Sequence, residues 1–353
     1  MIPILFPSTQ TKFKVSGSDK GSVGGGKGRL ADAISCIITE DIDRLNELEL
    51  VYPTNVPMFE ELKQGGIIAV KAHGINTFSD MEPYDIYKVT VRADGTAVFN
   101  AHHVSYRLAH SFVNGIAGQN RSASSMFTYV YGATPSLYPT WSTNASGSSG
   151  GQYVYSEDTK SVWEYFFDNK YSIRTVFGFD VQFNGFTMML RNEFGTHGKL
   201  DIRVGKNLVG GEAIRDELEC FNAICPVWRK DGVKVVCNPL IVQPTTPITP
   251  IVAKLIDYAE EIENQPTAAE LEAYARNYLD TVQPWLPHET MHVEIEQDHG
   301  FVCGDWANVF WGEADLVGTE MRIVQTTWNV LTESYESAEI GDLETGYVMT
   351  AEW

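Results

Sequence analysis

The stretch Met321–Gly341, MRIVQTTWNVLTESYESAEIG, decides the fold class of this chain. Its residues 321–326 alternate between two faces, which is the two-residue period of a β-strand. A short polar turn follows, and a second alternating stretch runs over residues 335–340 and closes on Gly341. The pattern predicts a β-hairpin or corner at the end of a small barrel.

Strand signals also dominate the first hundred residues. Strands are predicted at Ile67–Val70, Tyr84–Val91 and Val98–Val104. The Asp-Gly turn at residues 93–96 joins the last two as a hairpin. One or two helical turns are predicted at Val56–Gln64, before a Gly-Gly pair. The first 104 residues therefore predict an antiparallel β-barrel domain.

An inserted α+β domain is predicted over residues 105–199, where the texture of the sequence changes. Its predicted elements are helices at Tyr106–Ile116 and Lys160–Phe167, strands at Ile173–Phe179 and Phe186–Arg191, and a mobile Gly/Ser-rich loop at Trp141–Gly151.

The remaining chain divides at the Pro-rich loop Gln243–Pro250. Residues 200–250 predict strands that return to the barrel region, and residues 251–285 predict a helical segment. Its two helices are expected at Ile251–Glu263 and Ala268–Leu279, and Thr267 with Glu270 forms a capping box for the second. Residues 286–353 predict a C-terminal β-barrel segment. The fold class is thus mainly β with α+β insertions: two antiparallel β-barrels plus peripheral α/β domains.

The charge of the chain excludes one class of function. It has 46 acidic and 26 basic residues, a net charge of -20. A nucleic-acid-binding surface needs clustered Lys and Arg, so specific DNA binding is not expected. Two interpretations of the acidity stay open: acids spread over the outside for solubility, or an acidic channel that repels phosphate.

Cellular context follows from the cysteines and the first residues. Five cysteines and no secretory signal indicate reduced thiols made in a cytoplasm. The start MIPILFPSTQTKF has no basic region and no small-residue cleavage site, so we expect a first strand there. The sequence contains no run of eighteen apolar residues, so we expect no membrane span.

One motif resembles a zinc peptidase site. The residues His288-Glu289-Thr290-Met291-His292 match H-E-x-x-H, which on a helix lets two histidines hold zinc beside a general base. In a strand the two histidines would lie roughly 13 Å apart, too far for one metal. The alternation from His292 to Glu296 is typical of a strand, although Pro287 could begin a helix.

Other chemical motifs are weaker. Gly21–Lys27 matches G-x-x-x-x-G-K, but Gly28 stands where a phosphate loop needs Ser or Thr, so a Gly-rich turn is expected. Alternation sends His102 and His103 to opposite faces, which does not suit shared ligation. Trp141 and Trp163 could stack on sugars, although core packing is the commoner fate. We therefore expect no catalytic, cofactor-binding or metal-binding residues, and no cofactor.

Three stretches together resemble one family. In the first, Gly26–Pro53, the residues Leu30, Asp32, Ala33 and Tyr52-Pro53 match its opening pattern, which continues to a strand with Ala101, His103, Tyr106 and Leu108. In the second, Gly205-Lys206-Asn207-Leu208 matches a strand that usually ends in Tyr-Gly-Lys-Asn-Leu, with Val204 in place of the Tyr. The third is Val324–Gly341. The chain resembles the N-terminal structural part of phage tail-tip baseplate hub proteins, also described as tail-associated minor structural proteins or prophage endopeptidase tails.

The resemblance implies a structural protein of a virion, assembled in the host bacterial cytoplasm, and not an enzyme. It implies a homotrimeric ring of β-barrels that gates DNA and the tape-measure protein. Further partners would be the distal tail protein on one side and tail fibres or receptor-binding proteins on the other. Many members carry a long C-terminal lysin or fibre domain, whereas this chain ends at Trp353: it is either a short hub or an N-terminal part, and the hydrolytic activity of the family is therefore not carried over to it.

Three hypotheses follow. The first is the trimeric hub, with no metal and an acidic pore. The second is a zinc peptidase that uses His288, Glu289 and His292. The third is a receptor-binding or glycan-binding tail module that uses aromatic side chains near Trp141 or Trp163. The ordered resemblance along the chain favours the first.

Overall fold

The structure is a computed structural model of the chain. It describes residues 2–11, 13, 25–42, 46–71, 81–116, 120–132, 141–146, 152–153, 156–167, 172–259, 261–262, 264–286, 288–295 and 300–341. These residues form two compact units: unit 1, residues 1–212 and 291–353, and unit 2, residues 213–290. Among the described residues, no helix is both long and apolar enough to cross a bilayer.

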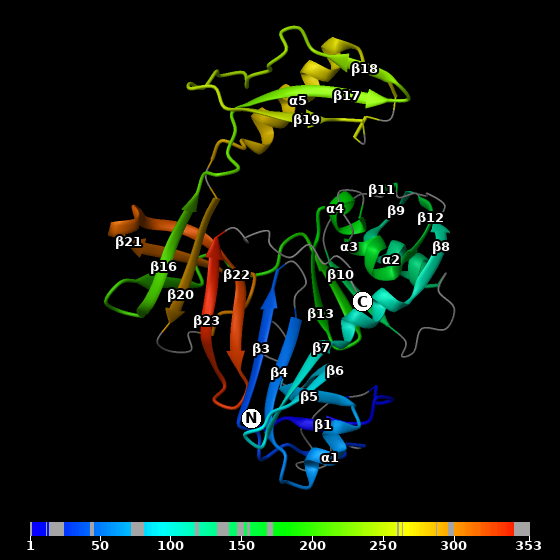
Figure 1. Cartoon of the computed structure of the whole chain (residues 1–353), viewed down its shortest axis with the longest axis vertical. Coiled ribbons are helices and arrows are strands. Elements are labelled where there is room, and N and C mark those ends of the chain that lie inside the picture. Colours follow the sequence, from blue (N-terminus) through cyan, green and yellow to red (C-terminus); the bar gives the residue numbers. More distant parts are fainter. Residues whose placement is uncertain are drawn as a thin grey trace. The chain divides into compact units, whose positions relative to one another are not determined.

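Unit 1 is organised around one sheet of thirteen strands (Figure 1). Its first half has the order β2-β1-β5-β6-β7-β4-β3, and every pairing in it is antiparallel. The strands are β1 (Ile4–Phe6), β2 (Gly28–Arg29), β3 (Ser35–Asp41), β4 (Asn46–Pro53), β5 (Ile67–Lys71), β6 (Met81–Val91) and β7 (Thr96–His103). The helix α1 (Met58–Lys63) lies between β4 and β5 in the chain and buries Phe59 and Leu62.

The second half of the sheet is built from the end of the chain. It contains β15 (Leu200–Arg203), β16 (Leu208–Asp216), β20 (His288–Ile295), β21 (Trp306–Trp311), the 3₁₀ helix η2 (Gly312–Ala314), β22 (Leu316–Asn329) and β23 (Ser334–Gly341). The sheet continues from β3 through β22, β23 and β20 to β16, and β15 joins through β21. Strands β16 and β20 run on into unit 2.

The fourteen-residue strand β22 connects the two halves. Its residues 316–322 pair with β21, whereas residues 325–329 lie between β23 and β3. This strand and β23 are the hairpin that the closing stretch of the sequence predicts. Mainly β architecture is therefore confirmed, and the described pairings join the two halves into one sheet.

Each half has its own hydrophobic core. The first packs fully buried side chains such as Leu50, Tyr52 and Phe99, and the second packs Ile202, Val309 and Ile323. Period-two burial along the strands supplies these residues, since alternate side chains point to one face. Two cores along one sheet are what two curved halves would produce.

The inserted region of unit 1 forms a third, aromatic core. Its elements are η1 (Val104–His110), β8 (Phe112–Ile116), β9 (Asn120–Arg121), α2 (Ala123–Gly132), β10 (Ser142–Ser146), β11 (Gln152–Tyr153), β12 (Ser156–Ser161), α3 (Val162–Phe167), α4 (Ile173–Phe177), β13 (Asp180–Asn184) and β14 (Thr187–Arg191). Helix α3 buries five of its six residues. Trp141 and Trp163 are 3% and 6% exposed and contact Phe183, so the expected core packing of both is confirmed.

Unit 2 is a small α+β module. Its strands β17 (Ala223–Lys230), β18 (Val233–Val236) and β19 (Ala253–Asp257) form a sheet of order β18-β17-β19. The helix α5 (Ala268–Val282) packs on one face through Leu271, Ala275 and Leu279. The predicted capping box is present: the hydroxyl oxygen of Thr267 accepts from the backbone N–H of Glu270, whose carboxylate accepts from that of Thr267.

Four predictions of local structure are wrong. Residues 173–177 form helix α4 instead of a strand, and residues 253–257 form strand β19 instead of a helix. Residues 142–146 of the expected loop form β10, which pairs in parallel with β14; residues 147–151 of that loop lie outside the described residues. Strand β18 pairs with β17 in unit 2 and does not return to the large sheet. Residues 106–116 divide into η1 and β8, so the predicted helix covers only the first part.

Candidate functional site

The sequence assigns no catalytic or binding residue, so the polar clusters of the structure are the candidates. The most deeply buried one joins strands β6 and β7 to the inserted region. His103 is 0% exposed, Ser105 1% and Glu82 5%. The Nε2 of His103 lies 3.0 Å from a Glu82 carboxylate oxygen, and its Nδ1 lies 2.9 Å from the Ser105 hydroxyl.

The hydrogen bonds of this cluster define the state of the histidine. Because the backbone N–H of Ser105 donates to Nδ1 of His103, the ring proton of neutral His103 is on Nε2 and is donated to Glu82. The same Glu82 oxygen accepts from the backbone N–H of Gly185, in the turn between β13 and β14. The Ser-His-Glu set therefore ties the β13–β14 hairpin to the large sheet.

Catalysis by this set would require access to the serine. In a serine hydrolase the hydroxyl must meet a substrate carbonyl. Here Ser105 lies in the first turn of the 3₁₀ helix η1 and is only 1% exposed. The geometry of the cluster therefore fits a structural connection between two layers.

The neighbouring histidine has a different environment, as the alternation of β7 predicts. The ring of His102 is stacked between Tyr87 and Tyr106, with centroids 3.8 Å and 4.4 Å away. Its Nε2 lies 3.0 Å from a Glu47 carboxylate oxygen that belongs to β4. The two histidine side chains thus lie on opposite faces of the sheet.

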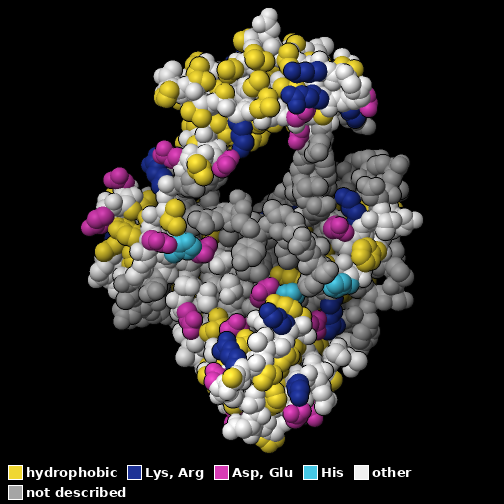
Figure 2. All heavy atoms as spheres, in the orientation of Figure 1, with side chains coloured by type: hydrophobic (Ala, Val, Ile, Leu, Met, Phe, Trp, Pro, Cys, Tyr) yellow, Lys and Arg dark blue, Asp and Glu magenta, His cyan; other side chains and the backbone are white. Residues whose placement is uncertain are grey.

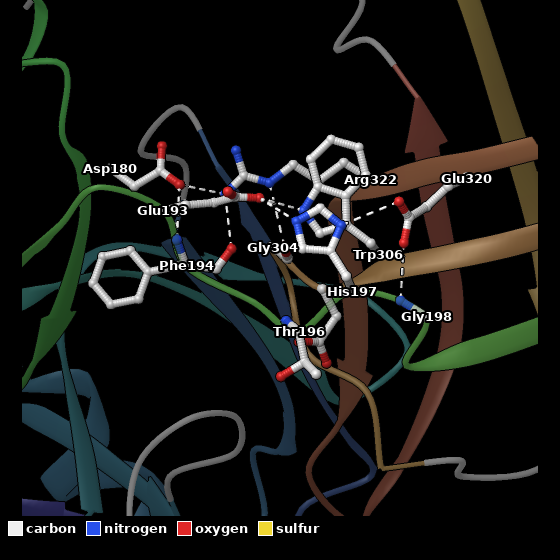
Figure 3. A network of polar contacts seen from close by, with 11 residues as sticks. Asp180, Glu193, Phe194, Thr196, His197, Gly198, Gly304, Trp306, Glu320 and Arg322 are labelled. Carbon is white, nitrogen blue, oxygen red and sulfur yellow. Dashed lines mark hydrogen bonds and ion pairs between the residues drawn. The ribbon is translucent and has the colours of Figure 1, made fainter.

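A second cluster joins the β14–β15 loop and β13 to the second half of the sheet (Figure 3). The Arg322 guanidinium on β22 donates to the Asp180 carboxylate and to the carbonyl oxygens of Phe194 and Gly304. Asp180 also accepts from the backbone N–H of Phe194. An ion pair of two half-buried groups that carries several hydrogen bonds holds this loop in place.

An exposed histidine extends the same cluster. The ring of His197 stacks on Trp306 with centroids 4.8 Å apart, and its two nitrogens face the carboxylates of Glu193 and Glu320. A hydrogen bond to Glu320 and the charges of both glutamates raise the pKa of His197. Because the two carboxylates approach opposite edges of the ring, they do not converge on one metal position.

A close backbone approach completes this junction. The backbone N–H of Thr196 donates to the buried carboxylate of Asp305, and Trp306 N–H donates to Thr196 O. Gly195 has a φ of +104°, and a Cβ there would overlap the carbonyl oxygen of Gly304. Only glycine lets these two chain segments come this close.

The metal and phosphate motifs fall in β-structure or outside the described residues. Residues 288–295 form strand β20, so the predicted strand is confirmed and His288 and His292 lack the helical spacing of a zinc site. His292 lies 3.2 Å from Glu339. Of Gly21–Lys27, residues 21–24 lie outside the described residues, and Lys27 forms an ion pair with Glu61 at 3.0 Å. No cluster of three metal-ligating side chains occurs among the residues described.

The deeply buried cysteines Cys36 and Cys303 show no sign of reactive chemistry. All five cysteines of the chain are free. Burial raises the pKa of Cys36 to about 12, and it raises that of Cys303 well above the usual value. A thiol in such an environment stays protonated and unreactive.

Sequence analysis missed the two polar clusters because their members are far apart in the chain. Glu82 and Gly185 are separated by 103 residues, and Asp180 and Arg322 by 142. The local alternation of β7 could have indicated only that His103 lies on the face of the strand opposite to His102.

Comparison with known proteins identifies solved structures that have a similar fold. No family model and no curated protein sequence matches the chain. Among solved structures, prophage tail protein gp18 of Listeria monocytogenes EGD-e matches with a TM-score of 0.59 at 12% identity, over 98% of this chain and 95% of that one. The prophage MuSo2 43 kDa tail protein of Shewanella oneidensis matches with a TM-score of 0.60 at 11% identity, over 97% and 98%. A tail protein of Neisseria meningitidis MC58 matches with a TM-score of 0.56 at 10% identity, over 91% and 94%. The predicted resemblance is confirmed at the level of the fold: the chain has the fold of prophage tail proteins along nearly its whole length.

Proposed function

We propose that the chain is a structural protein of a phage tail, and specifically a hub at the tail tip. The observation that carries this proposal is the match over 97–98% of the chain to two prophage tail proteins of nearly the same extent. The likeness includes the inserted region and unit 2, so it is more specific than a shared β-sandwich. The hub position rests on the motif resemblance.

The hub would be a homotrimeric ring. Two β halves in each subunit, each with its own core, would place six similar β bodies around a three-fold axis. Such a ring can join a six-fold tail tube and the distal tail ring to the fibres at the tip. Heterologous contacts between identical subunits close naturally into a three-fold ring.

The net charge of -20 supports passage of DNA through such a ring without binding. Acidic walls repel phosphate, and the tape-measure protein would leave by the same route. The polar clusters fit a structural role too, because each ties one layer of unit 1 to another. We propose no catalysis for this chain.

The experiment that tests the proposal is the mass of the purified chain by light scattering, with zinc assayed on the same sample. We expect a particle three times the 39.3 kDa of one chain, without stoichiometric zinc. Electron microscopy of the particle should show a ring with a central opening. A monomer with one zinc per chain would refute the hub and favour the peptidase.

A further inference from the structure

The ring of His197 lies between two carboxylates from different parts of unit 1 (Figure 3). Its Nε2 lies 3.2 Å from a carboxylate oxygen of Glu193, in the same loop, and its Nδ1 lies 3.1 Å from one of Glu320, on β22. An ionised carboxylate only accepts hydrogen bonds, so both ring nitrogens must carry a proton to bond both glutamates. Neutral histidine has one such proton and the imidazolium has two. The geometry therefore fits the charged ring.

A carboxylate neighbour is not by itself distinctive. Figure 2 shows histidine side chains beside acidic ones on the surface of the chain. His103 also contacts a carboxylate, through Nε2, but its Nδ1 accepts from a backbone N–H, which fits the neutral ring. Because His197 has a carboxylate at each nitrogen, its contacts depend on the second proton.

Other groups hold the two carboxylates beside the ring. The Glu193 oxygen that faces Nε2 also accepts from the indole N–H of Trp306, at 2.6 Å, and the other oxygen of Glu320 accepts from the backbone N–H of Gly198, at 3.0 Å. The ring of His197 is itself stacked on Trp306. None of these contacts requires the imidazolium, so the carboxylates keep their places when the ring loses a proton.

The ring is open to solvent, since its side chain is 57% exposed. In the described part of the chain, the charged groups that face it are the glutamates of β22 and of the loop. The hydrogen bond to the first and the charges of both raise the pKa of His197. Arg322 lies 5.9 Å from the centre of the neighbouring Trp306 ring and is paired with Asp180 of β13.

The inner part of the loop has attachments that do not depend on this proton. Arg322 donates to the carbonyl oxygen of Phe194, and Asp305, which is 3% exposed, accepts from the backbone N–H of Thr196. The guanidinium stays charged throughout the range in which histidine titrates. Loss of the His197 proton should therefore loosen residues 197–199 and leave residues 194–196 attached.

We propose that His197 is a proton-dependent latch at the outer end of the loop that joins the inserted region to the second half of the sheet. As the imidazolium it bonds both Glu320 and Glu193, and as the neutral ring it keeps only one of these two hydrogen bonds. The attachment is complete below the pKa of the unfolded state and weakens as pH rises through the pKa of the folded state. This inference does not rest on the proposed hub.

Hydrogen exchange of the full chain, followed by mass spectrometry from about pH 5 to about pH 9, tests the latch. The reporting amides are those of Gly198 and Lys199, which donate to Glu320 and to the carbonyl oxygen of Trp306. Dividing each rate by that of the same segment in the unfolded chain removes the intrinsic effect of pH on exchange. We expect the protection of these amides to fall about two- to fivefold with rising pH, which is the size of effect that exposed ion pairs produce.

Three variants locate the cause of this change. His197→Gln cannot take up the proton, so we expect low protection at every pH. His197→Arg keeps the charge, so we expect high protection at every pH. His292→Gln is the matched control: its ring lies 3.2 Å from Glu339, away from the loop on β20, so the wild-type profile should remain.

A wild-type profile that is flat over this range would overturn the latch. A pH dependence that persists in His197→Gln would overturn it as well, because another group would then be titrating. Low protection in His197→Arg at every pH would have the same meaning, since the shape of the ring and not its charge would then hold the loop. Should His197→Gln fail to fold by circular dichroism, Glu320→Gln carries the test, with the same loss of pH dependence expected. None of these outcomes depends on the mass of the particle, so the latch and the hub can fail separately.

Discussion

Replacement of His103 by leucine should be one of the most destabilising changes in the chain. The substitution removes the Nε2–H that His103 donates to the carboxylate of Glu82, which is 5% exposed and also accepts from the Gly185 N–H. The backbone N–H of Ser105 loses its acceptor as well. Removal of one partner of a buried charged group costs about 3–5 kcal/mol, and an unsatisfied buried N–H costs about 1–3 kcal/mol. Leucine refills part of the volume, so we expect a loss of about 4 kcal/mol.

The adjacent histidine provides the control. His102→Leu removes the contact between Nε2 and the carboxylate of Glu47, whose side chain is 39% exposed, and such partly exposed contacts contribute at most about 1 kcal/mol. Leucine also keeps part of the contact with Tyr87 and Tyr106. We expect a loss of about 1 kcal/mol. Two neighbouring histidines should therefore differ severalfold in their effect on the free energy of unfolding.

Urea unfolding measures these differences, with hydrogen exchange to assign the transition to unit 1, because two compact units need not unfold together. At a slope of about 2–3 kcal/mol per molar urea, His103→Leu should lower the midpoint by roughly 1.3–2 M. The double variant Glu82→Leu/His103→Leu should be more stable than His103→Leu, because no buried charge remains. Equal losses for the two histidines, or a double variant that is the less stable one, would refute the reasoning.

Four further predictions concern other features. Gly195→Ala should destabilise unit 1 by about 3 kcal/mol, because the new methyl overlaps Gly304 at a positive φ, whereas Gly205→Ala, with no atom within 4 Å, should cost about 1 kcal/mol in the same urea assay. Thr267→Ala should destabilise unit 2 by about 1 kcal/mol through loss of the capping box, with Thr267→Ser as the neutral control, as hydrogen exchange of α5 would show. The pKa of His197 is raised in the folded protein, so the contribution of its contacts to stability is fully present below the pKa of the unfolded state and is lost as pH rises through the pKa of the folded state. Because the hydrogen bond to Glu320 is the main cause, Glu320→Gln should lower the pKa of His197 in an NMR titration, and an unchanged pKa would contradict this cause. A thiol reagent should modify Cys220 and Cys225, which are partly exposed, and leave Cys36 and Cys303 untouched until urea is added.

Local patterns predicted those elements whose cause is local. The capping box of α5 needs only Thr267 and Glu270, and the β6–β7 hairpin needs only its Asp-Gly turn, where Asp94 accepts from Thr96. Likewise, the alternation of β7 sends His103 and His102 to opposite faces whatever surrounds them. These features can be predicted from the sequence because they depend only on neighbouring residues and not on a partner far away in the chain.

The wrong assignments have distant causes. Residues 251–263 have apolar positions at Ile251, Val252, Leu255 and Ile256, a spacing that suits a helix, yet residues 253–257 pair in parallel with β17, some thirty residues earlier. In the reverse case, the β-branched and aromatic residues at 173–179 suggested a strand. Ile173 and Phe177, four residues apart, are both buried in the aromatic core, so the helical spacing is the one that packing uses.

Strand β22 has a mechanical consequence. Since its residues 316–322 pair with β21 of the second half, and residues 325–329 pair with both β23 of the second half and β3 of the first, a pull on either half is transmitted along a covalent chain. The backbone bonds to β21, β23 and β3 lie across that direction, so force along β22 shears many of them at once instead of opening them one by one. We therefore expect the two halves to resist separation and to pass a displacement from one to the other along β22.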